Sequence, residues 1–118
     1  METIRLDDLT KSESFYIYST IGYIKGQLFR KYIGKENNYQ TKLMICKDIN
    51  DLLCELTEQN YLASDNNMLS YAELYTDYFT DKMVTSKYAK RPIFITFYLH
   101  IKNKDKYVKV VTECFFTN

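Results

Sequence analysis

The chain has 118 residues, of which 46% are hydrophobic and 26% charged, and its formal net charge is +1. Length and composition are those of one folded domain, and they exclude a disordered or low-complexity chain. No stretch approaches the length of a membrane-spanning helix, and no apolar signal segment follows Met1. We therefore expect a single domain over residues 1–118 that resides in the cytoplasm and has no membrane partner.

The charges are distributed unevenly along the chain. Residues 36–81 hold two basic and nine acidic residues, a net charge of −7, whereas residues 82–118 hold eight basic and two acidic residues, a net charge of +6. Such an asymmetry can produce one basic face that attracts a polyanion. The alternative is that the two segments pair with each other and that their fields largely cancel.

The first third of the chain predicts one strand and one helix. Residues 1–13 are polar and are expected to be irregular, whereas residues 14–18 (SFYIY) are typical of a short strand. Over residues 19–34 apolar side chains recur at helical spacing, and Gly34 suits the left-handed position after a helix. Two glycines inside this segment cost about 1 kcal/mol each relative to alanine, so a second strand with a turn or bulge is the alternative. We favour the helix.

The middle of the chain predicts a strand followed by two helices. Residues 39–46 (YQTKLMIC) are expected to form a strand, and residues 48–59 an amphipathic helix that stops at Asn60. Ser70 and Glu73 match the capping-box pattern, which indicates that an aromatic-rich helix starts after Ser70.

The last part of the chain predicts a β-hairpin. The runs Pro92–Lys102 and Tyr107–Phe116 alternate between apolar and mixed positions, and we expect them to pair with Asn103 opposite Lys106. One face of this hairpin is then apolar and forms the core. The predicted order is β-α-β-α-α-β-β, an α+β domain with a mixed or antiparallel sheet and the hairpin at its centre.

Catalytic and metal-binding chemistry finds little support in the sequence. His100 is the only histidine, the three cysteines have no C-x-x-C spacing, and no glycine-rich phosphate loop is present. We therefore expect no catalytic residue, no metal and no cofactor, and we expect the cysteines to be reduced and buried.

The second face of the predicted hairpin combines aromatic and basic residues, as single-stranded nucleic acid requires. Bases stack on aromatic rings, and phosphates attract nearby cations. Further lysines lie at the hairpin turn. The alternative is that the aromatic side chains form a second core layer. The candidate nucleic-acid-binding residues are Lys90, Arg91, Phe94, Tyr98, Lys102 and Lys109.

Two stretches carry a resemblance to a known family. Phe15–Tyr39 (FYIYSTIGYIKGQLFRKYIGKENNY) and Asn67–Met83 (NMLSYAELYTDYFTDKM) resemble the small PrgU-type proteins of enterococcal pheromone-responsive conjugative plasmids. The resemblance implies a PUA-like barrel, a fold often used on RNA, and a regulatory role that damps the expression of conjugation or surface-adhesin genes. It carries no motif from which site residues could be transferred.

We therefore expect a small non-enzymatic regulator that binds RNA. The alternative is a protein-interaction module, such as a phage- or plasmid-encoded inhibitor, that uses a tyrosine-rich surface, since tyrosine also suits protein interfaces. The sequence leaves the oligomeric state open.

Overall fold

The computed structural model describes residues 1–36, 38–75 and 91–117. Within these ranges it contains two long helices, two short 3-10 turns and one four-stranded sheet, so the α+β class is confirmed. No helix in the described part of the chain has the length and apolar content needed to cross a membrane. The elements are β1 (Thr3–Ile4), η1 (Leu6–Asp8), α1 (Lys11–Tyr32), α2 (Tyr39–Glu58), η2 (Asp65–Asn67), β2 (Tyr71–Leu74), β3 (Arg91–Leu99) and β4 (Tyr107–Thr117).

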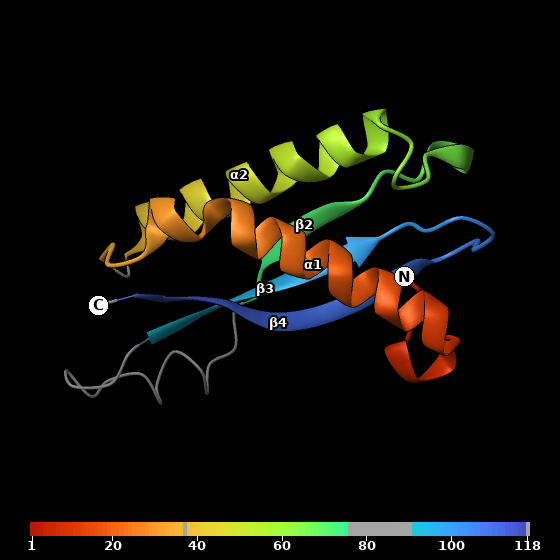
Figure 1. The fold of residues 1–118 in the computed structure, drawn as a ribbon, viewed down its shortest axis with the longest axis horizontal. Coiled ribbons are helices and arrows are strands. Elements are labelled where there is room, and N and C mark those ends of the chain that lie inside the picture. The colour runs from red at the N-terminus through yellow and green to blue at the C-terminus, as the bar shows by residue number, and fades with distance from the viewer. Residues whose placement is uncertain (37, 76–90, 118) are drawn as a thin grey trace.

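The sheet is mixed, and one of its faces is covered by both helices (Figure 1). Its strand order is β1-β4-β3-β2, with β1 parallel to β4 and the other neighbours antiparallel. The core lies between the helices and the covered face, because apolar side chains of both layers are buried there. Its fully buried members include Ile17, Ile24, Ile45, Ile49, Leu53, Ile93, Ile95, Phe97, Leu99 and Val108.

Helix α1 starts earlier than the sequence pattern indicated. Thr10 Oγ1 accepts a hydrogen bond from the Glu13 backbone N–H at 3.1 Å, and the Glu13 carboxylate accepts one from the Thr10 N–H at 2.9 Å. This is a complete capping box, and it nucleates a helix through residues 14–18, so the predicted strand there is wrong. The predicted helix over residues 19–34 is confirmed, and Gly34 follows it with a φ of 78°.

Residues 39–46 form the first part of helix α2, so the strand predicted there is wrong. Asn38 caps this helix by accepting a hydrogen bond from the Thr41 N–H at 2.8 Å. The helix continues without interruption because its buried residues recur every three or four positions, and these are Ile45, Ile49, Leu53 and Leu56.

The predicted stop of α2 at Asn60 is confirmed. Asn60 has a φ of 63°, and its N–H donates to the Thr57 carbonyl at 3.0 Å. The next N–H, of Tyr61, donates to the Leu56 carbonyl at 2.9 Å, which completes a Schellman motif.

The prediction that a helix starts after Ser70 is wrong for residues 71–74. Tyr71–Leu74 forms β2, which pairs with β3, and Ser70 Oγ accepts a hydrogen bond from the His100 N–H at 2.8 Å instead of capping a helix. The rest of that predicted helix lies outside the described residues.

The hairpin is confirmed as an antiparallel pair, but its register differs from the predicted one by two residues. Leu99 pairs with Val108, so β3 ends before the turn and Asn103 does not face Lys106. The faces of the strands are preserved, because a shift of two residues keeps the alternation. A register shift between Ile93 and Phe94 then changes the pairing towards the end of β4.

Strand β3 ends because the backbone and the ring of His100 are used elsewhere. Besides its N–H bond to Ser70, His100 accepts a hydrogen bond at its carbonyl from the Ala63 N–H at 3.0 Å. Its buried ring places Nδ1 at 2.8 Å from the Met68 carbonyl and Nε2 at 3.0 Å from the Lys104 carbonyl. His100 therefore joins the segment before β2 to the loop between β3 and β4.

The two helices are joined at the end of α1 by one carboxylate. Asp48 accepts hydrogen bonds from the Tyr32 hydroxyl and from Lys31 Nζ, the latter at 2.7 Å. Burial alone would raise the pKa of Asp48, but these two hydrogen bonds outweigh it and hold the pKa below its ordinary value. The ionised form of Asp48 therefore stabilises the fold.

Replacing Asp48 should make the free energy of unfolding less dependent on pH in the acidic range. Asp48→Asn should lower the free energy of unfolding by about 1 kcal/mol near pH 7, because the charge-assisted hydrogen bonds are lost. A carboxyl with a depressed pKa contributes fully above its unfolded pKa of about 4, so the difference from wild type should shrink as the pH falls below that value and through the lower folded pKa. Urea denaturation of both proteins at several pH values measures this; a difference that is constant with pH would contradict it.

Removing the His100 ring should be much more costly than changing an exposed neighbour. His100→Ala should lower the free energy of unfolding by about 2–4 kcal/mol, since it leaves a cavity and removes the ring nitrogens that face the Met68 and Lys104 carbonyls. Lys102→Ala, in the same loop and exposed, serves as the control and should cost no more than about 0.5 kcal/mol. Similar losses in the two variants would show that His100 does not organise this loop.

Candidate nucleic-acid interface

The sheet face opposite the helices carries the predicted aromatic residues. On β3, Phe94 and Tyr98 alternate with side chains that are buried in the core with the helices, so they lie on the other face. Both are half-buried, and Thr96 between them is buried. The placement of Phe94 and Tyr98 on one face therefore agrees with the sequence pattern.

Three tyrosines from three strands meet on this face, and we call them the tyrosine cluster: Tyr71, Tyr98 and Tyr107. Tyr71 lies directly opposite Tyr98 in the ladder, and their rings stack with centroids 4.7 Å apart and an interplanar angle of 17°. The Tyr107 ring meets Tyr71 edge-on at 5.4 Å and Tyr98 at 6.2 Å. All three side chains are half-buried, so each ring is held by its neighbours and keeps part of its surface accessible.

Hydrogen bonding fixes the orientation of the cluster. The Tyr107 hydroxyl donates to the Leu69 carbonyl at 3.0 Å, which ties the start of β4 to the residues before β2. Burial, followed by the nearby charge of Glu73, raises the pKa of Tyr71. The Tyr71 phenol therefore remains protonated at neutral pH and can donate a hydrogen bond to a ligand.

One lysine accompanies the tyrosines. Lys109 faces Tyr98 in the ladder, is exposed, and places Nζ at 6.0 Å from the centroid of the Tyr98 ring, within cation–π range. Two exposed carboxylates lie at neighbouring register positions, Glu73 opposite Thr96 and Glu113 opposite Phe94. The charge on this face is consequently mixed, whereas the sequence led us to expect a basic one.

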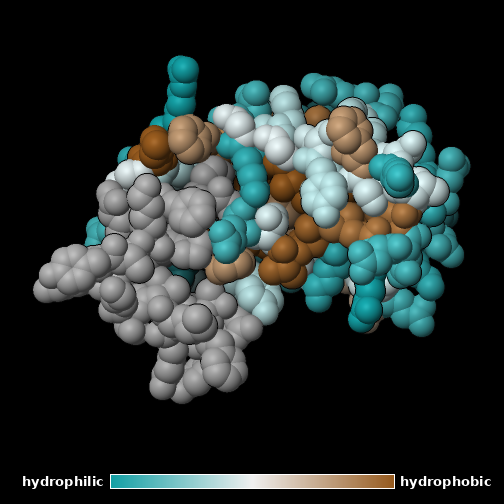
Figure 2. All heavy atoms as spheres, turned by 60° about the horizontal axis from the view of Figure 1, so that its bottom comes forward, coloured by the Kyte–Doolittle hydropathy of each residue, from teal (hydrophilic) through white to brown (hydrophobic). Residues whose placement is uncertain are grey.

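A second aromatic pair extends the face. The rings of Tyr75 and Phe94 lie 6.2 Å apart at 61°, and the Tyr75 N–H donates to the Phe94 carbonyl at 3.1 Å. Tyr75 is 38% exposed. Figure 2 shows the molecule from the lower side of Figure 1, where apolar atoms reach the surface in the middle and hydrophilic side chains surround them outside the grey residues.

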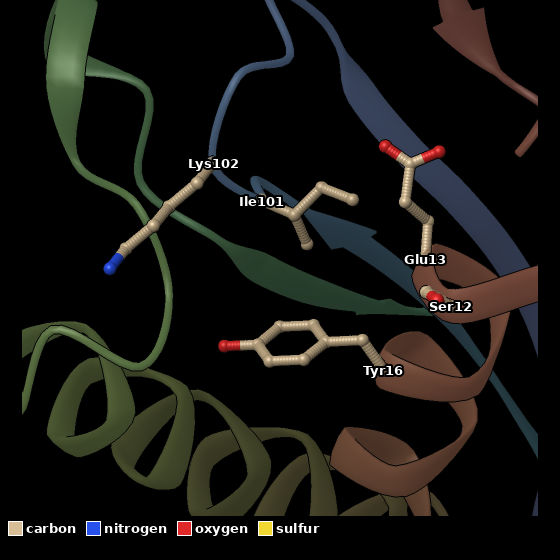
Figure 3. Close-up of a pocket in the computed structure, with 5 residues that line it drawn as sticks. All are labelled: Ser12, Glu13, Tyr16, Ile101 and Lys102. Carbon is tan, nitrogen blue, oxygen red and sulfur yellow. The ribbon is translucent and has the colours of Figure 1, made fainter. Parts of the chain in front are cut away.

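Lys102 lies away from the tyrosine cluster, in contrast to the prediction. Because β3 ends at Leu99, Lys102 belongs to the following loop and lines a hollow of about 290 Å³ between that loop and α1. In Figure 3 the Tyr16 ring lies across this hollow and Lys102 extends away from Glu13. The hollow is lined by Ser12, Glu13, Tyr16, Ile101 and Lys102.

The lysines of the hairpin turn are paired with acidic residues near the N-terminus. Lys104 Nζ lies 3.0 Å from the Glu13 carboxylate, and Lys106 Nζ lies 2.9 Å from that of Glu2. The hydrogen bond from the Thr10 N–H, followed by that from Lys104, lowers the pKa of Glu13. The lysines of the turn, which the sequence analysis grouped with the aromatic and basic face, thus hold the loop to the N-terminal segment.

The two remaining predicted contacts are Lys90 and Arg91. Lys90 lies outside the described residues, and of Arg91 only the backbone is described, paired with Thr117 at the start of β3.

Of the cysteines, Cys54 is exposed on α2, which corrects the expectation of a buried thiol. Cys46 is partly buried and its Sγ lies 3.4 Å from the Ala72 carbonyl; burial raises the pKa of this thiol.

Sequence reasoning missed Tyr71 because residues 71–74 were assigned to a helix. The pattern could have indicated a strand, since Tyr71, Glu73 and Tyr75 alternate with Ala72 and Leu74, of which Ala72 is buried.

Comparisons of the chain with protein-family models, with curated proteins and with solved structures find no match.

Proposed function

We propose that this protein is a non-enzymatic regulator that binds single-stranded RNA through the tyrosine cluster and Lys109. The observation that carries the proposal is the stacked pair Tyr71–Tyr98, with the Lys109 ammonium group over the Tyr98 ring, on the sheet face opposite the helices. Aromatic rings on an open sheet face bind unpaired bases by stacking, and a lysine beside them contacts the phosphates.

The geometry suits stacking because the rings are already oriented. The Tyr98 ring contacts the rings of Tyr71 and Tyr107, and the Tyr107 hydroxyl is hydrogen-bonded to the Leu69 carbonyl. When a base stacks on a ring that is already fixed, less side-chain entropy is lost on binding than when the ring is mobile. The second pair, Tyr75 and Phe94, lies on the same face and offers a further stacking position.

The charge on the face limits the electrostatic part of binding. Lys109 attracts phosphate, whereas Glu73 and Glu113 repel it. We therefore expect stacking to contribute most of the affinity and the dependence on salt to be shallow.

The resemblance to the PrgU-type proteins adds the biological context of this proposal. Binding to a messenger RNA would damp the expression of plasmid conjugation or surface-adhesin genes, and the sheet would correspond to part of a PUA-like barrel. A second candidate, a protein-interaction module, is favoured by a different observation, the exposed aromatic side chains of α1.

Truncating Tyr98 should weaken RNA binding without unfolding the domain. Tyr98→Ala should lose about 1–3 kcal/mol of binding free energy for an unstructured single-stranded RNA of about twelve nucleotides, as measured by fluorescence anisotropy. Tyr98→Phe keeps the ring and should bind within about threefold of wild type. Tyr23→Ala, at an exposed tyrosine on α1, is the matched control and should bind normally. Wild-type protein that does not bind RNA, or a Tyr98→Ala variant that binds normally, contradicts the proposal.

Removing the Lys109 charge should change the dependence of binding on salt. Lys109→Ala should lower the affinity and reduce the slope of log K against log salt by about one. Lys47→Ala, exposed on α2 and paired with Asp51, should leave the slope unchanged. Lys102→Ala should have a smaller effect than Lys109→Ala, because Lys102 lies in the loop beyond β3. An unchanged slope for Lys109→Ala would exclude a phosphate contact at this position.

A further inference from the structure

Helix α1 has a second apolar face, on the side that points to solvent. Its core face is formed by residues such as Ile17, Ile24 and Leu28, which are buried against the sheet and α2. At 100° per residue, a second set lies within about 80° of the helix circumference, centred about 130° from the core face. We call this set the α1 stripe, and it consists of Phe15, Tyr18, Gly22, Gly26 and Phe29 of the helix and of Ile33, the residue that caps its C-terminal end.

The large members of the α1 stripe are well exposed. Phe15 is 74%, Tyr18 60%, Phe29 54% and Ile33 57% exposed. These four side chains lie in one row over about 27 Å, as two pairs separated by the glycines, and large apolar side chains this exposed along one row are typical of an interaction site.

The two glycines of the α1 stripe are not explained by packing within the described chain. Each costs about 1 kcal/mol relative to alanine in a helix interior. Among the described residues, no heavy atom lies within 4 Å of the place where a Cβ would stand at Gly22 or Gly26. Small residues at this spacing allow another helix backbone to approach closely, so the two glycines suit contact with a further helix.

The stripe has the same order of sizes in both directions: two large residues, two glycines and two large residues. A helix that packs antiparallel on it therefore meets a matching surface if it is the same helix. Phe15 then lies level with Ile33 of the second copy, Tyr18 with Phe29 of the second copy, and the glycines face each other. We propose that two copies of this chain associate through antiparallel packing of their α1 stripes, an isologous two-fold interface.

The area is sufficient for a specific contact. Burying the exposed parts of the four large side chains removes about 500 Å² per copy, or about 1,000 Å² for the pair, since a large side chain can bury roughly 200 Å². Specific interfaces begin at about this size, and the backbone around the glycines adds to it.

The basic residues beside the stripe are compatible with this arrangement. Arg30 lies level with Tyr18 of the second copy and not with another cation. Lys25 would lie nearest to its own counterpart, but its Nζ is directed to Thr112 Oγ1 of β4, at 3.4 Å. The sheet faces with the tyrosine clusters point away from the interface, so this inference does not depend on RNA binding.

Sedimentation velocity on wild-type protein and three variants tests the proposal. From about 1 to 100 μM the wild type should shift from the 14.1 kDa mass of one chain to twice that mass. Gly22→Leu should weaken association by about tenfold to a hundredfold, because the added side chain separates the helices. It should not destabilise the monomer, since the position is open and leucine favours helix.

The other two variants separate the stripe from general effects on α1. Phe29→Ser should also reduce association, whereas Gln27→Leu, which adds the same side chain at an exposed position outside the stripe, should not. A wild type that stays monomeric at about 100 μM, or a dimer that Gly22→Leu and Phe29→Ser leave unchanged, overturns the proposal. A monomer that floats with anionic phospholipid vesicles would also overturn it, by showing that lipid is the occupant.

Discussion

The arrangement of the C-terminal half depends on the four hydrogen-bonding groups of His100. Its N–H donates to Ser70 Oγ and its carbonyl accepts from the Ala63 N–H, so neither group bonds within the β3–β4 ladder. Its buried ring faces the carbonyls of Met68 and Lys104. Buried polar groups must be paired, so these contacts stop β3 at Leu99 and hold the segment before β2 against the loop. They also bring β2 beside β3, where Tyr71 reaches Tyr98.

The layering follows from the two helices, which bury apolar residues on one face of the sheet and leave the other to aromatic and charged side chains. On that second face, each tyrosine of the cluster comes from a different strand, so the cluster exists only when β2, β3 and β4 are paired. A site built in this way is as rigid as the sheet, which is the property that a stacking surface requires.

Helix α1 serves two surfaces at once. Its buried side completes the core, and its outer side presents large apolar residues around two glycines that lower its own helix propensity. The stability lost at the glycines is offset by the capping box at Thr10 and by the contacts of the core face. Association through the outer side would leave both tyrosine clusters accessible.

The sequence by itself determined the α+β class, the helix over 19–34, the stop at Asn60 and the buried face of the hairpin, because caps and alternation are local properties. It also placed Phe94, Tyr98 and Lys109 on one face, since a register shift of two residues keeps the faces. For Tyr71 the local pattern fits a strand as well as a helix, and the tertiary structure decided for the strand, as it decided that Lys102 belongs to a loop. Ser70 matches a capping box, but its oxygen binds the N–H of His100, 30 residues away, and no local pattern contains that contact.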